Sequence, residues 1–331
     1  MVDHEGIIPT HDPHGTRPDV RDLEAGGAGY PVGPLRVGVI VNTGKDGAKE
    51  VVREVQAFAD AHPGRIELML ETKTGELIGH NGKNCRKCHD IANDADICLV
   101  AGGDGSLLGV ARDLYPTKAP ILGVNIGSLG FLTSVARGNL EAALQTVLER
   151  KWVVSTRIAL ELTIFRSTQH EFIPCALNDV VVSRGTLSRL VRVRVDFGDH
   201  FVTEYNCDGL IVATPTGSTA YSVSAGGPIM APDAGALAIT PICPHTLSNR
   251  SLVVGTHAPI RLSLPPQATS LVVQYDGQPG GELRPGDFLE IRLAPEPIRL
   301  AFTPGNDFFH LLRQKLKWTG TNLPQSEGEH K

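Results

Sequence analysis

The chain has 331 residues, with 31 Lys and Arg against 36 Asp and Glu, a formal net charge of −5 and 41% hydrophobic residues. This length favours about two domains, with enough apolar residues for a core in each. The slight negative charge argues against nucleic-acid binding, which needs an excess of positive charge. No apolar run reaches the roughly 18 residues of a membrane helix, so no membrane association is expected.

Residues 1–34 are rich in Gly, Pro, Asp and His and contain no apolar stretch. This composition predicts a disordered tail and not a signal peptide. Acidic residues outnumber Arg in this tail, which argues against a mitochondrial transit peptide. The six cysteines are therefore not expected to form a disulfide framework, and the expected location is the cytoplasm.

Residues 35–151 alternate between short apolar runs and helical periodicity, which is typical of an α/β domain. Such an alternation predicts a Rossmann- or flavodoxin-like parallel sheet that binds ligands at the carboxyl ends of its strands. The predicted strands are 35–41, 66–70, 97–101 and 121–125, and the predicted helices are 46–61, 105–114 and 138–150.

Cys85-Arg-Lys-Cys88-His89 has the C-x-x-C-H pattern of covalent haem attachment. Haem attachment needs export, of which this sequence shows no sign. A zinc site needs four ligands, and only His80 is an obvious addition. We interpret the stretch as a polar, cysteine-bearing loop.

From about residue 152 the hydrophobic period changes from helical to alternating. In Leu190–Phe197, valines and Phe197 occupy one face while charged residues occupy the other. Such strands, separated by Pro and Gly clusters, predict an all-β sandwich domain over residues 152–303. Residues 304–331 are predicted to contain a helix starting near Phe308 that packs back on the α/β domain, with a frayed polar end. The further predicted strands are 158–165, 252–254, 260–264, 271–275 and 288–293.

Gly102-Gly103-Asp104-Gly105 follows a predicted strand and opens a predicted helix. Backbone N–H groups of Gly102, Gly103 and Gly105 could therefore hold phosphate oxygens. The stretch is neither a Walker A loop nor a G-x-G-x-x-G fingerprint, and it offers no lysine for a β- or γ-phosphate. Asp104 could accept a proton from a hydroxyl or bind a phosphate-bound metal ion. A plain Asp turn is the alternative.

Three more polar stretches follow apolar strands. In Asn125–Leu132, Phe131 could stack on a base or belong to the core. Asn178-Asp179 enters an apolar strand and would suit a ribose diol or an adenine edge, unless it is a strand-edge turn. Residues 208–228 are so rich in hydroxyls and glycines that a polar ligand is the better interpretation.

These stretches together, in this order, resemble the NAD kinase family over roughly residues 36–318. Gly-Gly-Asp-Gly alone is shared with diacylglycerol and sphingosine kinases, whereas Asp208 through Pro228 is far more specific. The resemblance implies transfer of the γ-phosphoryl of ATP, or of inorganic polyphosphate, to the 2′-hydroxyl of the adenosine ribose of NAD, giving NADP. It also implies a divalent metal ion such as Mg²⁺, carried on the nucleotide phosphates, and a homodimer or homotetramer.

The resemblance implies a role for each matching residue. Asp104 is the expected general base, and Gly105 lies against the substrate. Asn178 and Asp179 hold adenine and ribose groups, while Asp208 lies at the nicotinamide end. Many bacterial members carry Arg at the Asn206 position, so the preference between NAD and NADH stays open. Further expected NAD contacts are Thr219, Ala220, Tyr221, Ser224 and Gln278, together with the more variable Arg189 and Asn206.

Two rival functions share parts of this pattern. A lipid kinase would need an apolar or membrane-docking acceptor site, and the hydroxyl-rich segment 214–224 fits a nucleotide better. A non-catalytic nucleotide-binding regulator could have lost Asp104, which is present here.

Overall fold

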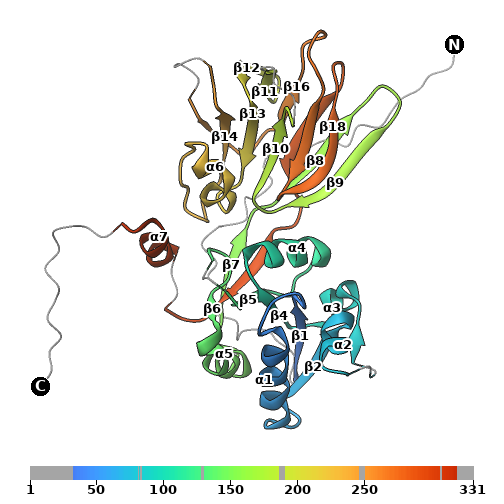
Figure 1. The fold of residues 1–331 in the computed structure, drawn as a ribbon, viewed down its shortest axis with the longest axis vertical. Coiled ribbons are helices and arrows are strands. Elements are labelled where there is room, and N and C mark those ends of the chain that lie inside the picture. Colours follow the sequence, from blue (N-terminus) through green and yellow to red (C-terminus); the bar gives the residue numbers. More distant parts are fainter. Residues whose placement is uncertain are drawn as a thin grey trace, which may run out of the picture.

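The computed structural model describes residues 33–80, 82, 84–127, 130–185, 191–245, 250–305 and 308–318. An α/β part forms one end of the molecule, and two antiparallel sheets form the other (Figure 1). Most of the predicted N-terminal tail, the predicted frayed end at 320–331 and the candidate Arg189 lie outside the described residues.

The sheet of the α/β part has the strand order β3-β2-β1-β4-β5-β20-β7, with β6 paired to β5. Its first five strands in this order run parallel, so β1, β4 and β5 end at the same edge. The strands are β1 (Leu35–Val41), β2 (Ile66–Glu71), β3 (Cys85–Arg86), β4 (Ile97–Gly102), β5 (Ile121–Asn125), β6 (Val135–Ala136), β7 (Val153–Arg157) and β20 (Ile298–Phe302).

Helices cover both faces of this sheet, because alternate residues of each strand point to opposite faces. On β1, Val37, Val39 and Val41 pack with α1 and α5, whereas Ile40 packs with α3 and α4. The helices are α1 (Ala48–Asp60), α2 (Thr72–Leu77), α3 (Cys88–Asp94), α4 (Asp104–Leu114), the 3₁₀ turn η1 (Arg137–Asn139) and α5 (Leu140–Leu148).

The two six-stranded sheets pack face to face around a second core. Their orders are β15-β14-β13-β10-β17-β18 and β12-β11-β16-β19-β8-β9. On β11 the valines are buried and the arginines exposed, as the alternating sequence predicts. The strands are β8 (Leu160–Phe165), β9 (His170–Ala176), β10 (Asp179–Ser183), β11 (Val191–Phe197), β12 (His200–Cys207), β13 (Gly209–Ala213), β14 (Ala236–Ile242), β15 (Leu252–Gly255), β16 (Ile260–Ser263), β17 (Leu271–Tyr275), β18 (Gln278–Leu283) and β19 (Phe288–Leu293).

The predicted all-β domain, residues 152–303, is wrong at both of its ends. β7 and β20 join the α/β sheet, where Leu300 lies opposite Ile121 of β5 and Ser155 of β7. Local alternation identifies a strand but not the sheet that it joins, which is why the sequence placed both in the sandwich. The chain therefore crosses twice between the two parts.

The stretch predicted as a cysteine-bearing loop forms regular secondary structure instead. Cys85 lies in β3, and Cys88 is the first residue of α3. Ile91 and Ala92 bury one face of this short helix in the α/β core. Burial raises the pKa of the Cys88 thiol to about 11, so this thiol stays protonated near neutral pH. All six cysteines are free thiols, and within the described residues no three His, Cys, Asp or Glu side chains are placed to hold a metal ion.

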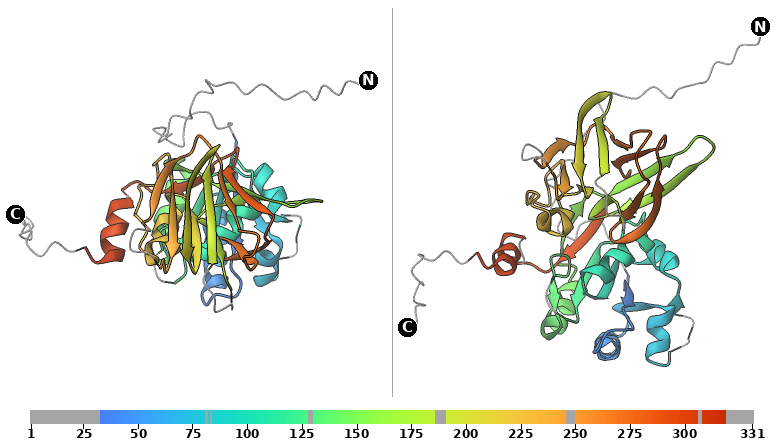
Figure 2. Two further views of the ribbon diagram at one scale, coloured as in Figure 1. Left: turned by 90° about the horizontal axis from the view of Figure 1, so that it is seen from above. Right: turned by 45° about the horizontal axis from the view of Figure 1, so that its top comes forward.

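The C-terminal helix α7 (Phe308–Leu316) lies at the side of the molecule (Figure 2). Leu311 and Leu312 are buried, and the rings of Phe308 and Phe131 are 6.4 Å apart. In the described ranges, every helix is too short or too polar to cross a membrane.

Candidate active site

Asp104 is the first residue of α4, directly after the carboxyl end of β4. Its Oδ2 accepts the N–H of Phe131 at 2.8 Å, and its Oδ1 accepts those of Leu132 at 3.1 Å and Thr133 at 3.3 Å. A loop that follows the neighbouring strand β5 thus fixes the orientation of this carboxylate. Because the side chain is only partly buried, it remains accessible to a ligand.

The glycines near Asp104 serve different purposes. A Cβ on Gly130 would lie 1.8 Å from Oδ1 of Asp104, so only glycine lets the loop approach the carboxylate. A Cβ on Gly103 or Gly105 would meet nothing within 4 Å. The fold itself therefore does not require glycine at these two positions, and a closely bound ligand would explain it.

A cavity of about 250 Å³ opens beside Asp104 and contains two lysines that the sequence analysis missed. Lys45 follows β1, and Lys315 comes from α7. The glycine turn itself contains no lysine, but the fold brings these two from opposite ends of the chain. The stretch Asn42-Thr-Gly-Lys45, at the carboxyl end of a parallel strand, was the available signal for Lys45. The other described lining residues are Gly103, Asn125, Gly127 and Gly130.

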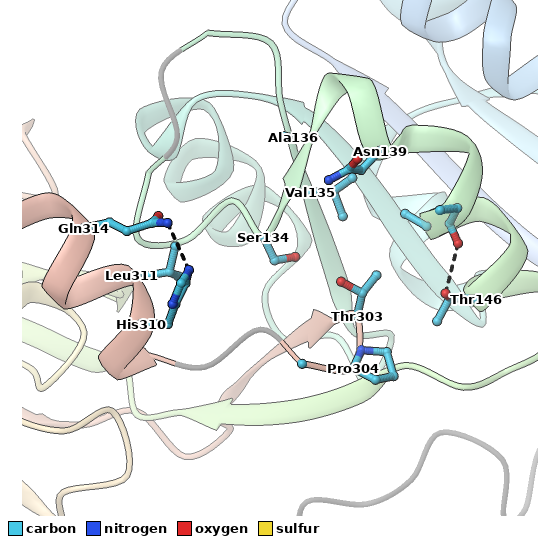
Figure 3. Close-up of a pocket in the computed structure, with 13 residues that line it drawn as sticks. Ser134, Val135, Ala136, Asn139, Thr146, Thr303, Pro304, His310, Leu311 and Gln314 are labelled. Atoms are coloured by element: carbon cyan, nitrogen blue, oxygen red, sulfur yellow. Dashed lines mark hydrogen bonds between the residues drawn. The ribbon is translucent and has the colours of Figure 1, made fainter. Parts of the chain in front are cut away.

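A second cavity, of about 650 Å³, lies between α7 and α5 (Figure 3). His310 and Gln314, which bond to each other at 2.9 Å, face it from α7. Asn139 and Thr146 line the opposite wall, where the Thr146 hydroxyl donates to the Ala142 carbonyl at 3.0 Å. Helix α7 lines both cavities, so they are neighbours.

Asn178 and Asp179 lie where β9 passes into β10, on the sandwich side of the molecule. Their backbone N–H groups donate to Oδ1 of Asp276, at 2.7 and 3.3 Å. Asp276 lies in the hairpin turn between β17 and β18, and its Oδ2 is 3.0 Å from Nη1 of Arg112 on α4. The sequence analysis gave no role to Arg112 or Asp276, although Asp276 stands two residues before the candidate Gln278, because their pairing joins segments that are distant in the chain.

Asp179 has an unusual electrostatic environment. Burial, and then the negative charge of Asp276, raise the pKa of its carboxyl group to about 7. A carboxyl group that changes charge near neutral pH is often found at a functional site, although a structural cluster can have the same property.

Much of the hydroxyl-rich segment supports the fold and does not face a ligand. The hydroxyls of Thr214 and Ser218 donate to the carbonyls of Leu177 and Pro215, both at 2.6 Å. Ser222 bonds to Thr240 at 3.1 Å, and all of these side chains are buried. A Cβ on Gly217 would lie 2.0 Å from the Asn178 carbonyl oxygen, so this turn packs directly against the Asn178–Asp179 pair.

The candidate NAD contacts of this segment are more accessible. Thr219 is half-buried and donates its hydroxyl to the Thr216 carbonyl at 3.2 Å, while Ala220 is half-buried beside it. Tyr221 and Ser224, in the short helix α6 (Tyr221–Ser224), are exposed. Gln278 is exposed across from Tyr275 at the Asp276 hairpin.

Asp208 and Asn206 lie apart from the Asn178–Asp179 pair. β10 and β13 pair with Asp179 opposite Ala213 and Ser183 opposite Gly209, so Asp208 is at the far end of the pair. Four residues of strand separate the two ends, about 14 Å. There Asp208 pairs with Arg184 at 3.0 Å, and Asn206 accepts from Arg192 at 3.3 Å. The structure thus forms two clusters at opposite ends of β10 and β13, one with Asn178 and Asp179 and the other with Asp208 and Asn206.

Two family models together match most of the chain. Residues 37–152 match the model of the ATP-NAD kinase N-terminal domain, and residues 177–302 match that of the ATP-NAD kinase C-terminal domain. The chain belongs to the ATP-NAD kinase family.

Individual members of the family cover most of the chain. An NAD kinase of Syntrophotalea carbinolica is 40% identical over 286 residues, covering 86% of this chain and 98% of that protein. An NAD kinase of Geotalea daltonii is 43% identical over 281 residues, covering 81% and 99%. The family and the two-part fold predicted from the sequence are confirmed.

Two solved structures share the fold. A yeast NADH kinase complexed with NADH has a TM-score of 0.77 and 25% identity, covering 89% of this chain and 91% of that one. An NAD kinase from Archaeoglobus fulgidus in complex with ATP has a TM-score of 0.65 and 23% identity, covering 86% and 100%. The second similarity concerns the fold alone.

Proposed function

We propose that this chain is an NAD kinase that transfers the terminal phosphoryl group of ATP to the 2′-hydroxyl of the adenosine ribose of NAD, giving NADP and ADP. The bond between the 2′-oxygen and the γ-phosphorus forms while the bond from that phosphorus to the β,γ-bridging oxygen breaks. The observation that carries this proposal is Asp104, held by three backbone N–H groups beside a cavity with two lysines, in a chain of this family.

Asp104 is proposed as the general base. A sugar hydroxyl holds its proton far more tightly than a carboxylate does, so Asp104 does not remove the proton in advance. It orients the hydroxyl and takes the proton as the bond to phosphorus forms. The N–H groups of Phe131, Leu132 and Thr133 keep the carboxylate in place for this step.

Lys45 and Lys315 are proposed to contact the phosphates of the donor. In a loose phosphoryl-transfer transition state, positioning and neutralisation of charge provide most of the acceleration. The open space around Gly103 and Gly105 lets phosphate oxygens approach the backbone at the start of α4. The neighbouring cavity of about 650 Å³ has room for the nucleoside half of ATP, which polyphosphate lacks.

A divalent cation, Mg²⁺ by its chemistry, fits this arrangement. Asp104 is the only carboxylate among the described residues that line the 250 Å³ cavity, so the ion would take most of its ligands from phosphate oxygens. When bound, it neutralises charge that develops on the transferred group.

The two clusters of candidate contacts are proposed to bind different parts of NAD. Asn178, Asp179 and Gln278, with Phe131 at the Asp104 loop, lie toward the adenosine. Asp208 and Asn206, with Arg189 outside the described residues, lie toward the nicotinamide. The remaining proposed adenosine contacts are Thr219, Ala220, Tyr221 and Ser224. The proposed location of the reaction is the cytoplasm, in keeping with six free thiols.

The test is a direct assay. Purified protein is incubated with NAD, Mg²⁺ and ATP, and NADP is measured with an NADP-specific dehydrogenase. Parallel reactions replace ATP by polyphosphate and NAD by NADH, and thereby measure donor and acceptor preference. Formation of no NADP or NADPH in any combination would exclude the proposed function.

A further inference from the structure

The carboxylate of Asp276 organises the backbone that carries the proposed adenosine contacts. Its side chain is 0% exposed and accepts the N–H groups of Leu177, Asn178 and Asp179. In return, the N–H of Asp276 donates to the Asp179 carbonyl at 3.0 Å. Asp276 adopts a φ of 46° in its hairpin turn, a conformation that Asp tolerates better than most residues.

A buried carboxylate needs a compensating charge, because removing it from water costs several kcal/mol. Arg112 provides this charge at 3.0 Å, with its own side chain 16% exposed and its guanidinium 5.7 Å from the centre of the Tyr275 ring. The Arg112 side chain is therefore held by an ion pair and by an aromatic ring of the same hairpin.

Arg112 and Asp104 belong to the same helix. They are eight residues apart on α4, which corresponds to about 12 Å along its axis. α4 lies where the α/β part meets the sandwich (Figure 1). One rigid helix thus carries the proposed base at one end and, near the other, the contact to the segment 177–179.

Resting on the proposed function, we propose that Arg112 and Asp276 are positioning residues that set the placement of Asp104 relative to the Asn178–Asp179 pair. They act through α4 and through the backbone of residues 177–179. Other bonds also join the two parts of the molecule, such as Arg157 Nη1 to Thr216 Oγ1 at 3.5 Å. The Arg112–Asp276 pair differs because Arg112 lies on the helix of the proposed base, while Asp276 bonds the backbone of residues 177–179.

The matched control is the Arg36–Asp96 pair. There, too, a carboxylate that is 5% exposed accepts a backbone N–H and pairs with a guanidinium at 2.9 Å. Asp96 precedes β4, and Arg36 lies in the first half of β1, so this pair is at the sheet edge away from Asp104. Loss of the control pair should affect stability but not the alignment of the site.

The experiment compares R112M, R112K and R36M with the wild type in steady-state assays with NAD and ATP. A displacement of about 1 Å can cost up to about a hundredfold in rate. We expect kcat/KM for NAD to fall at least tenfold in R112M and to recover to within about threefold of wild type in R112K, because lysine keeps the charge. KM for ATP should stay within about twofold in both, and R36M should keep the wild-type kcat/KM.

Two outcomes would overturn the inference: R112M within threefold of wild type, or R36M with a loss as large as that of R112M. Should R112M fail to fold, the double variant R112M/D276N is used in its place. This double variant leaves no unpaired buried charge at the Arg112–Asp276 contact. This variant should fold and still lose at least tenfold in kcat/KM, and wild-type kinetics would contradict the proposal. If the wild-type protein forms no NADP, the proposed function has failed instead, so the two failures are distinguishable.

Discussion

At the scale of single residues, the carboxylate of Asp104 is held in a fixed orientation and remains accessible, as a general base must be. The first prediction concerns this residue. Asp104→Asn is nearly isosteric but cannot accept the proton. We expect kcat to fall by about a hundredfold or more, the usual scale for loss of a general base, while NAD binding measured by calorimetry is largely kept. The control is Asp113→Asn, an exposed carboxylate on the same helix. Activity of Asp104→Asn within a few-fold of wild type would refute the assigned role.

The second prediction concerns how the carboxyl group of Asp179 makes the stability of the protein depend on pH. Its pKa is raised from 3.8 to about 7, first by burial and then by the charge of Asp276. Because the folded state disfavours the ionised form, the stabilising effect of the neutral carboxyl is complete below pH 4 and is lost as pH rises toward about 7.

Asp179→Asn removes this titration. Its free energy of unfolding relative to wild type should therefore increase by roughly 2 kcal/mol between about pH 5 and about pH 8. Urea denaturation at both pH values measures this, with the exposed Asp199→Asn as control. An equal difference at the two pH values would show that Asp179 does not titrate as inferred.

At the scale of elements, the carboxyl ends of β1, β4 and β5 gather loops that are distant in sequence. The loop after β1 provides Lys45, the turn after β4 provides Asp104, and the loop after β5 fixes the Asp104 carboxylate. Helix α7 adds Lys315 from the far end of the chain. The proposed donor site therefore depends on the docking of α7 as well as on the sheet.

The corresponding prediction concerns the two lysines. Hydrogen bonds to charged groups contribute about 1.5–3 kcal/mol, so Lys45→Ala and Lys315→Ala should each raise KM for ATP about tenfold or more. KM for NAD should stay near wild type, and Lys118→Ala, an exposed lysine elsewhere on the α/β part, serves as control. A raised KM for NAD with an unchanged KM for ATP would mean that the donor and acceptor sites have been exchanged.

At the scale of the whole molecule, the two clusters of candidate NAD contacts stand about 14 Å apart along β10 and β13. Tyr221, 46% exposed, and Asp208 lie on segments that a neighbouring subunit could reach in the expected homodimer or homotetramer. If a neighbour completes the nicotinamide side, dissociation should lower specific activity, since mass action then sets the competent fraction. Light scattering and specific activity over one dilution series measure this. A monomer that is fully active at every concentration would show that one chain contains the complete site.

The local sequence alone determined much of this protein. Apolar periodicity identified the strands and helices near the site, and a glycine turn between β4 and α4 identified Asp104, because both signals depend on neighbours within a few residues. The long motif from Asp208 to Pro228 identified the family. The composition of this motif predicts that its hydroxyls face a ligand, whereas the structure shows that Thr214, Ser218 and Ser222 are buried.

Only the tertiary structure decided the rest. Whether β7 and β20 join one sheet or the other depends on strand pairing, which local alternation does not encode. Lys45 and Lys315 share a cavity only because parallel strands end at one edge and α7 returns to it. Arg112 and Asp276 are 164 residues apart, and their pairing follows from burial of a charge between two parts of the molecule. Each of these contacts depends on packing between distant segments, so a local pattern can indicate one partner, such as Lys45, but not the pairing.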